Sequence, residues 1–259
     1  MSISALHVGN FKGIKDDIWI DIKPITLFIG RNSSGKSSCI HALTSLSQTM
    51  KLPNNNRPLI LDDEYASIHL GRFIEVIHTK SYSDAIKLGL RLDSVPFAAR
   101  ENRRRTRLKA KAEAIYEFKC TKRTQDLYLD RAEFTIGDFK YTSKRKKDNS
   151  YETVYVKDNT KVKCNIKDGF ILERSSFMEA TDEDSFYKLV PFFAFQREIQ
   201  SELQNSQYLG PFRQSPIRRY PTRGSSPIEV GAQGESTATL LANEIIQSRT
   251  RTHIGQIAK

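Results

Sequence analysis

The residues with the clearest chemical meaning lie in the stretch FIGRNSSGKSSCIHAL, residues 28–43. Gly30, Gly35, Lys36 and Ser37 fill the pattern G-x-x-x-x-G-K-S. In such a loop, successive backbone N–H groups surround phosphate oxygens, the lysine reaches the β- and γ-phosphates, and the serine hydroxyl binds Mg²⁺. The pattern predicts an ATP and Mg²⁺ site with Lys36 and Ser37 as the catalytic pair and Ser37 as the metal ligand.

The elements that position this loop must be a strand before it and a helix after it. Residues 25–29 form a nearly continuous apolar run, which favours a strand covered on both faces. Residues 40–50 carry apolar side chains at helical spacing, so the helix N-terminus would face the phosphates. The predicted nucleotide contacts of the loop are Gly30, Arg31, Asn32, Ser33, Ser34, Gly35, Lys36, Ser37 and Ser38.

The composition is that of an ordinary globular protein and excludes membrane-spanning helices. The chain has 259 residues, of which 38% are hydrophobic and 27% charged, enough for one large domain or two small ones. No apolar run approaches the roughly 20 residues that span a bilayer, and the N-terminus lacks a secretory signal. We therefore expect a cytoplasmic protein without a membrane partner. Cys39, Cys120 and Cys164 are odd in number and widely spaced, which favours reduced thiols.

The net charge of +11 is concentrated in one segment. Residues 100–147 contain 16 Lys or Arg against 7 Asp or Glu, an excess of nine, and the run RENRRRTRLKAK at 100–111 is the densest part. Such a run is often only a solvated insertion that adds solubility. Its arginines also suit phosphate contacts. The candidate nucleic-acid residues are Arg103, Arg104, Arg105 and Arg107, with docking of an acidic protein surface as the alternative.

Alternating segments separated by turn residues predict an antiparallel β region in the middle of the chain. We expect strands at 3–9, 18–22 and 88–92, and a meander of further strands between 114 and 174. A short helix is expected at 183–190, ended by Pro191, and another at 235–248, with residues 207–231 mostly in loops.

Several quoted segments resemble the ATPase heads of the ABC superfamily's chromosome-maintenance and DNA-repair (SMC/RecF/OLD-like) branch. These segments are LHVGNFKGIKD (6–16), GRNSSGKSS (30–38), LGRFIEVIH (70–78), YLGPFRQSPIRRY (208–220) and VGAQGES (230–236). They look most like the AAA-family ATPases of bacterial anti-phage defence systems of the Septu or retron-associated type. The resemblance implies an α/β P-loop NTPase, with residues 1–259 as the N-terminal portion of an ABC-type head. Residues 95–150 would be a basic insertion and antiparallel β lobe within it.

The resemblance also implies further site residues and partners. Asn10, Phe11 and Lys12 would lie near the nucleotide base or phosphates, although Phe11 suits a core position in a β-turn equally well. A glutamine would serve the Mg²⁺ and the attacking water, and Gln207, Gln214 and Gln233 are the candidates. The implied partners are a second ATPase head, in a homodimer or higher oligomer, and an effector protein such as a nuclease.

Other motifs expected of such a head are missing from the sequence. We find no LSGGQ-like signature segment, and no apolar run followed by Asp-Glu near the end of the chain. PLILDDEY at 58–65 imitates the latter, but it follows the phosphate loop too soon, so Asp63 and Glu64 are interpreted as decoys. The sequence therefore predicts nucleotide binding and leaves ATP hydrolysis open.

Three alternatives stand beside an ATPase that controls a partner effector. The first is a nucleotide-binding scaffold that does not hydrolyse ATP, or a nucleic-acid-binding subunit. A GTPase is disfavoured because the chain has no N-K-x-D and no D-x-x-G motif. A small-molecule kinase fits poorly with the long β meander.

Overall fold

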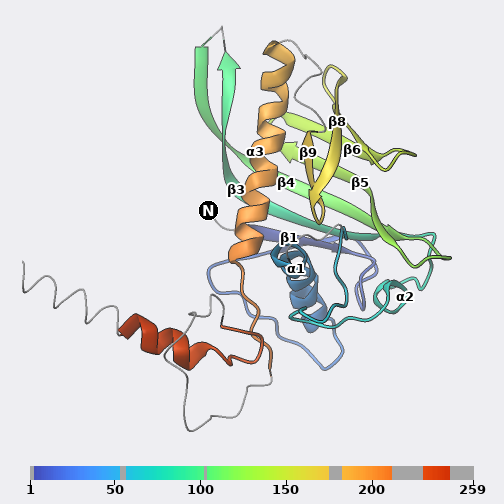
Figure 1. Ribbon diagram of the computed structural model, residues 1–259, viewed down its shortest axis with the longest axis vertical. Helices are drawn as coiled ribbons and strands as arrows, with labels where there is room; N and C mark the ends of the chain where they lie inside the picture. Colours follow the sequence, from blue (N-terminus) through green and yellow to red (C-terminus); the bar gives the residue numbers. More distant parts are fainter. Residues whose placement is uncertain (1–2, 53–56, 102–103, 175–182, 212–229, 246–259) are drawn as a thin grey trace, which may run out of the picture. The chain divides into compact units, whose positions relative to one another are not determined.

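One antiparallel sheet of nine strands dominates the structure, a computed structural model (Figure 1). The structure describes residues 3–52, 57–101, 104–174, 183–211 and 230–245. The strand order is β2-β1-β3-β4-β5-β6-β7-β8-β9, and each neighbouring pair is antiparallel. The strands are β1 (Ile3–Gly9), β2 (Ile18–Asp21), β3 (Ile86–Glu101), β4 (Arg104–Cys120), β5 (Leu127–Ile136), β6 (Phe139–Arg145), β7 (Tyr151–Tyr155), β8 (Thr160–Asp168) and β9 (Ile171–Arg174).

The antiparallel β lobe predicted from the sequence is confirmed. The predicted strands at 3–9, 18–22 and 88–92 lie in β1, β2 and β3, and the meander occupies β4 to β9. Residues 95–150 belong to this sheet, because β3 pairs with β1 on one side and β4 on the other. The parallel sheet usual for α/β folds is not formed among the residues that the structure describes.

Helices α1 (Lys36–Lys51) and α3 (Glu183–Asn205) contact each other and pack against the sheet (Figure 1). Phe192 of α3 packs edge-to-face on Phe134 of β5, with ring centroids 5.0 Å apart. The Ser47 hydroxyl of α1 donates to the Leu203 carbonyl of α3 over 2.8 Å. The short helix α2 (Phe73–Val76) lies between α1 and β3 in the chain. These contacts fix α1, and with it the end of the phosphate loop, on the sheet.

The predicted end of a helix at Pro191 is wrong, because Pro191 lies inside α3, which continues to Asn205. Proline removes one backbone donor and strains the preceding turn. Here the cost is offset by burial of the residues that follow, since Phe192, Phe195, Ile199 and Leu203 are all fully buried. Packing against the sheet therefore outweighs the local preference of proline.

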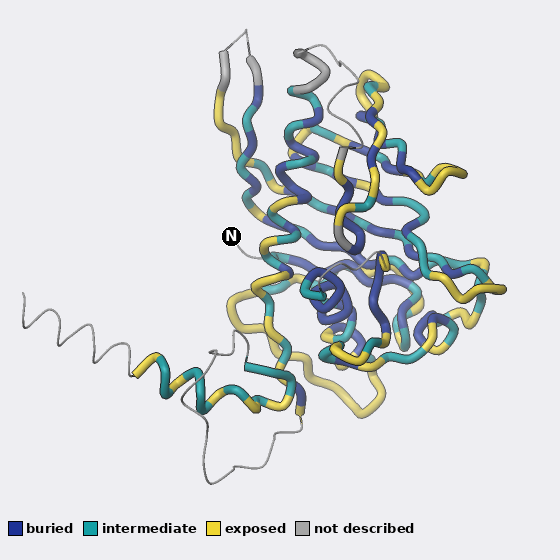
Figure 2. The backbone as a smooth tube through the Cα atoms, viewed as in Figure 1, coloured by how far each residue is buried: buried dark blue, intermediate teal, exposed yellow. Residues whose placement is uncertain are grey.

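The predicted strand before the phosphate loop is also absent. Residues 22–30 have no regular secondary structure, and Ile25, Leu27 and Ile29 are 82%, 77% and 91% exposed. Figure 2 shows this segment, between β2 and α1, as exposed. We call residues 24–29 the apolar pre-loop segment. No described backbone group bonds to its N–H or C=O groups, so its apolar side chains and its backbone are both without a sheet neighbour.

Within the basic run at 100–111, residues 100–101 end β3 and residues 104–111 begin β4, and these two stretches pair as a hairpin. Arg104 and Arg105 belong to β4, whereas Arg103 lies outside the described residues. A run of arginines is thus compatible with β structure, because RLKAKAEA alternates charged and small or apolar residues.

Residues 206–259 form a second compact unit, apart from the unit of residues 1–205. Residues 237–245 are helical, within the predicted helix at 235–248. A bond from the Gly210 amide to the Ala232 carbonyl, 2.8 Å long, joins the two described parts of this unit. Across both units, no described helix is long and apolar enough to cross a membrane.

Candidate nucleotide-binding site

The phosphate loop is built around two residues with positive φ at the start of α1. Ser33 has φ 62° and Gly35 has φ 90°, and Gly35 caps the helix without a side-chain hydrogen bond. Left-handed backbone of this kind suits glycine and turns successive N–H groups to one side. A Cβ on Gly30 would lie 2.8 Å from the Ser34 hydroxyl, so the loop closes tightly where the sequence has no side chain.

The N-terminus of α1 is arranged to attract an anion. The first N–H groups of a helix have no partner within the helix, and its dipole is positive at this end. The first turn contains Lys36, Ser37 and Ser38 and carries no acidic residue. The predicted metal ligand Ser37 therefore lies in the first turn, beside the donors that would hold phosphate oxygens.

Lys36 folds back over the loop that precedes it. Its ammonium donates to the carbonyl oxygens of Gly30 and Arg31 over 2.8 and 2.5 Å. The only described partners of this cation are thus neutral backbone oxygens, and no carboxylate competes for it. The loop therefore holds an uncompensated positive charge within its own curve, as a phosphate site needs.

The turn at residues 10–14 lies next to the first turn of α1. A Cβ on Gly13 would be 4.0 Å from both the Gly35 Cα and the Ser38 hydroxyl. Asn10 and Lys12 have positive φ, and the Lys12 amide donates to the Val76 carbonyl over 2.6 Å. The structure thus brings the segments at 6–16 and 30–38 close together, and both of them resemble parts of the ATPase heads, where they share a role in nucleotide binding.

The three candidate residues of this turn differ in what their side chains contact. Phe11 is fully buried in the core. The Asn10 side chain is taken up by residues 79–85, since it donates to the Ala85 carbonyl over 3.0 Å and accepts from the Thr79 amide over 3.0 Å. Only Lys12 sends a polar group toward α1, with its ammonium 3.2 Å from the His41 Nδ1.

Lys12 and His41 form a pair whose protonation follows from burial and proximity. Burial lowers the pKa of His41, and the neighbouring Lys12 cation lowers it further. Burial also lowers the pKa of Lys12. A neutral His41 accepts a hydrogen bond from the ammonium, so Lys12 is a second cation close to the start of α1.

Comparison with known proteins agrees with this geometry. A family model of the AAA ATPase domain matches residues 1–210. The chain belongs to this family. The match supports a P-loop ATPase of the SMC/RecF-like type, so the nucleotide-binding ATPase character predicted from the loop is confirmed at that level. No curated protein and no solved structure matches the chain.

ATPases of this family use a nucleotide and usually Mg²⁺, and the residues of the loop fit both. The backbone donors, Lys36 and the Ser37 hydroxyl supply the groups such a ligand needs. No cluster of three or more His, Cys, Asp or Glu able to hold a metal occurs within the described ranges. The Ser37 hydroxyl would be the ligand that the phosphate loop supplies to Mg²⁺.

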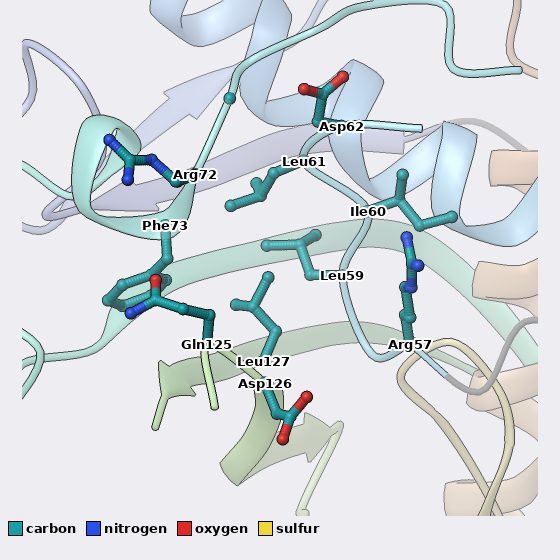
Figure 3. A pocket seen from close by; sticks show the side chains of 11 residues that line it. Arg57, Leu59, Ile60, Leu61, Asp62, Arg72, Phe73, Gln125, Asp126 and Leu127 are labelled. Atoms are coloured by element: carbon teal, nitrogen blue, oxygen red, sulfur yellow. The ribbon is translucent and has the colours of Figure 1, made fainter. Parts of the chain in front are cut away.

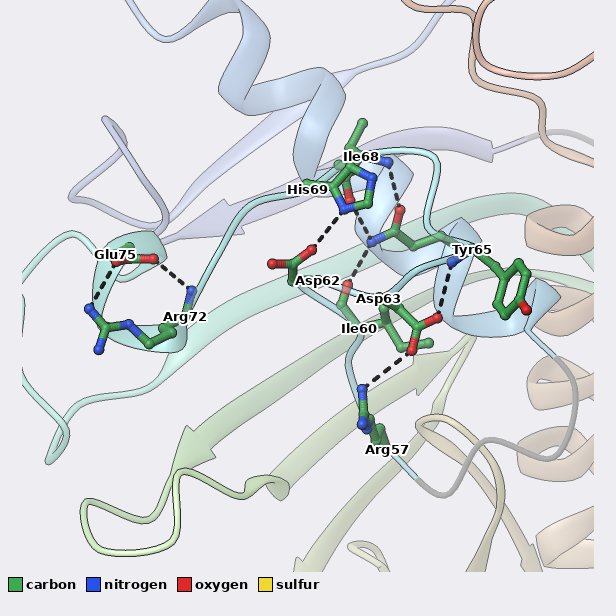
Figure 4. A network of polar contacts seen from close by, with 10 residues as sticks. Arg57, Ile60, Asp62, Asp63, Tyr65, Ile68, His69, Arg72 and Glu75 are labelled. Carbon is green, nitrogen blue, oxygen red and sulfur yellow. Dashed lines mark hydrogen bonds and ion pairs between the residues drawn. The ribbon is translucent and has the colours of Figure 1, made fainter. Parts of the chain in front are cut away.

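The Asp-Asp-Glu sequence at 62–64 lies near the C-terminal end of α1, at the other end of the helix from the phosphate loop (Figure 4). Gln48 donates to the Ile60 carbonyl over 2.8 Å and accepts from the Ile68 amide over 3.2 Å. Gln48 follows Lys36 by twelve residues, roughly 18 Å along the helix axis. The carboxylates have local partners, Asp62 with His69 at 2.7 Å and Asp63 with Arg57 at 3.4 Å. This arrangement supports the interpretation of Asp63 and Glu64 as decoys.

A separate cavity of about 410 Å³ lies beside the same segment (Figure 3). Leu59, Leu61 and Phe73 form its apolar floor, and Arg57 and Asp126 stand at its rim. Because its lining comes from residues 57–62, 71–73 and 125–127, it contains no residue of the phosphate loop.

The remaining candidates of the sequence belong to the unit of residues 206–259 or lie outside the described residues. Gln207 and Gln233 are exposed and belong to the unit of residues 206–259, and Gln214 lies outside the described residues. Gln233 stands in a turn where its backbone N–H donates to the Glu235 carboxylate over 3.0 Å. Sequence reasoning missed His41, whose only signal was its position one turn after the loop.

Proposed function

We propose that this chain binds ATP with Mg²⁺ on residues 30–38 and uses nucleotide-dependent association with a second ATPase head to control a partner effector. The observation that carries the nucleotide site is the Lys36 ammonium, folded over Gly30 and Arg31 at an acid-free helix N-terminus. Lys12, beside the same helix turn, supplies a second cation for the phosphates.

The exposed pre-loop segment supports the association part of the proposal. Ile25, Leu27 and Ile29 alternate along an unpaired backbone and are almost fully exposed. Exposed apolar residues at every second position of a segment with an unpaired backbone favour pairing with another strand. We infer that a further strand covers this segment in the working assembly and thereby fixes the loop.

The effector and the biological setting rest on resemblance alone. The segments at 208–220 and 230–236 resemble those of ATPases from bacterial anti-phage defence, so a defence role with an effector such as a nuclease is proposed on that ground. A non-hydrolysing nucleotide-binding scaffold is the second candidate. It is favoured by the roughly 18 Å along α1 between the phosphate loop and the segment that carries Asp63.

The nucleotide site is tested by titrating wild type, Lys36→Ala and Ser37→Ala with a fluorescent ATP analogue, with and without Mg²⁺. We expect Lys36→Ala to lose most affinity at either condition, since the loop loses its positioned cation. Ser37→Ala should lose mainly the Mg²⁺-dependent part of the affinity. Lys51→Ala, at the other end of α1, is the matched control. Equal affinities for wild type and Lys36→Ala would reject the site.

Turnover separates the two candidate functions. Phosphoryl transfer needs groups that position the attacking water and stabilise the developing charge. Asp62 and Asp63 pair with His69 and Arg57, and among the described residues Lys36 has only carbonyl partners, so we expect the chain alone to bind ATP without sustained hydrolysis. Robust turnover that disappears in Lys36→Ala would contradict this and would point back to Asp63 and Glu64.

A further inference from the structure

The hairpin of β3 and β4 extends beyond the rest of the sheet as a two-stranded ribbon. Residues 104–110 of β4 pair only with residues 95–101 of β3, since β5 joins β4 from Ala112 onward and β1 leaves β3 at Leu92. Figure 1 shows both strands continuing past their neighbours. Seven residues of strand span roughly 24 Å.

On β3, one face of this ribbon is packed, and this fixes the direction of the other face. Phe97 and Ala99 are buried, Phe97 stacks edge-on against Phe139 with centroids 5.8 Å apart, and α3 contacts β3. Side chains alternate between the two faces of a strand. Arg107, Lys109 and Lys111 therefore share the opposite face, and all three are exposed.

These three cations are unpaired, unlike other cations of the same sheet. None of them forms an ion pair or hydrogen bond with any residue that the structure describes. By contrast, Arg91 of β3 binds Glu113, Lys119 of β4 binds Asp130, and Arg131 of β5 contacts Glu133. The ribbon thus carries a row of three free positive charges about 6.8 Å apart, at every second residue of one strand.

The residues that face Arg107 and Lys109 across the ribbon are small. The register pairs Arg107 with Ala98 and Lys109 with Pro96, so no carboxylate covers either charge. Two strands lie about 4.8 Å apart, and a two-stranded ribbon that carries the small residues Pro96 and Ala98 on the outer face of one strand is narrow enough for the roughly 12 Å major groove of B-form DNA. The deep, narrow major groove of A-form RNA does not admit such an element.

We propose that the outer face of the β3–β4 ribbon binds the phosphate backbone of double-stranded DNA, with Arg107, Lys109 and Lys111 as its contacts. The face presents no aromatic side chain among its described residues, so base stacking and single-strand binding are not favoured. Cations of this kind position a protein on DNA without reading its sequence. The inference goes beyond the proposed nucleotide site and does not depend on it.

The test measures binding to a labelled mixed-sequence DNA duplex by fluorescence anisotropy over a series of salt concentrations. Each neutralised phosphate contributes about −0.9 to the slope of log K against log salt. The triple variant Arg107→Gln, Lys109→Gln, Lys111→Gln should therefore flatten the slope by about 2.7 units. It should also retain the circular dichroism spectrum and the ATP-analogue affinity of wild type.

The matched control removes the same charge elsewhere, through Lys144→Gln, Lys147→Gln and Lys157→Gln. These lysines are exposed and form no ion pair with described residues. An unchanged slope in the control and a flattened slope in the ribbon variant support the proposal. Equal flattening in the ribbon variant and the control would show that only the net charge matters, and this would overturn the proposal. Equal affinity of the wild-type protein for duplex RNA and duplex DNA would exclude the fit to the major groove and would also overturn it. A failure of ATP binding would leave the DNA measurement intact and would count against the nucleotide site alone.

Discussion

Replacing Gln48 with alanine is expected to destabilise the protein without weakening nucleotide binding. Gln48 is buried near the end of α1, and its amide closes three contacts with residues 60 and 68. Alanine would leave the buried Ile60 carbonyl and Ile68 amide unsatisfied. Each such group costs about 1–3 kcal/mol. We expect a loss of about 3 kcal/mol in the free energy of unfolding.

Urea unfolding followed by circular dichroism measures this loss. With a slope of about 2–3 kcal/mol per molar urea, the midpoint should fall by about 1 M or more. Gln207→Ala is the matched control, because Gln207 is exposed and surface changes of this kind usually alter stability by less than about 0.5 kcal/mol. A midpoint for Gln48→Ala equal to that of the control would refute the assignment of these hydrogen bonds.

The same variant tests whether the segment carrying Asp62 and Asp63 belongs to the nucleotide site. Gln48 anchors that segment roughly 18 Å from Lys36 along α1. In buffer without urea, where the variant remains folded, its affinity for an ATP analogue should match that of wild type. A tenfold weaker affinity in the folded variant would show that residues 58–65 contribute to the site after all.

Two further predictions concern stability. Gly89→Ala should lower the free energy of unfolding by about 1–3 kcal/mol or more, because a Cβ there would lie 2.3 Å from the Ala114 carbonyl oxygen of β4. Gly13→Ala is the control, since the nearest atoms to its Cβ would be 4.0 Å away, and equal urea midpoints for the two variants would contradict the packing. The thermal midpoint should fall as the pH drops from about 7.5 to 5.5, because burial lowers the pKa of His7 and His41 below the ordinary 6.5, so the unfolded chain binds protons that the folded chain does not. This stability is present above pH 6.5 and is lost below it; a midpoint that stays constant over this range would contradict the burial of both rings in their neutral form.

The β meander could be predicted closely because its signals are local. The segment LYLDRAEFTI, which forms β5, lies within the meander predicted between 114 and 174, and Gly137, with φ 54°, stands in the turn before β6. Alternation of apolar and polar residues sets which face is buried, and turn residues set the ends. Neither signal depends on residues far away in the chain.

The hairpin at residues 100–111 was harder to interpret because charge obscured the alternation. Leu108 and Ala110 alternate with Arg107, Lys109 and Lys111, which is a strand pattern with one cationic face. This alternation of cationic side chains with other residues at every second position predicts the strand, whatever the hydrophobicity of the segment. Its pairing with residues 95–101 of β3 also explains why Pro96 is tolerated, since beyond Leu92 that strand has only one neighbour.

The end of α3 was mispredicted for a different physical reason. Pro191 is a strong local signal against a helix, yet the apolar residues that follow it continue at helical spacing to Leu203. A proline inside a helix costs about 3 kcal/mol or more, through the lost hydrogen bond and the clash of its ring with the preceding turn. Burying several large side chains against the sheet returns more, at about 1.5–3 kcal/mol each. Periodicity over the whole segment was therefore the better guide than the single proline.

The structure of the pre-loop segment could not be predicted from local sequence signals alone. Its apolar residues predicted burial, but burial requires a neighbouring strand, and the segment has none among the described residues. The phosphate loop itself needs only residues 30–38, because Gly35, the helix N-terminus and Lys36 are all contributed within nine positions. Phosphate binding and completion of the sheet are therefore physically separate steps. A ligand that orders the loop would also restrict the segment joined to it, and a strand that pairs with the segment would restrict the loop, so each step should favour the other.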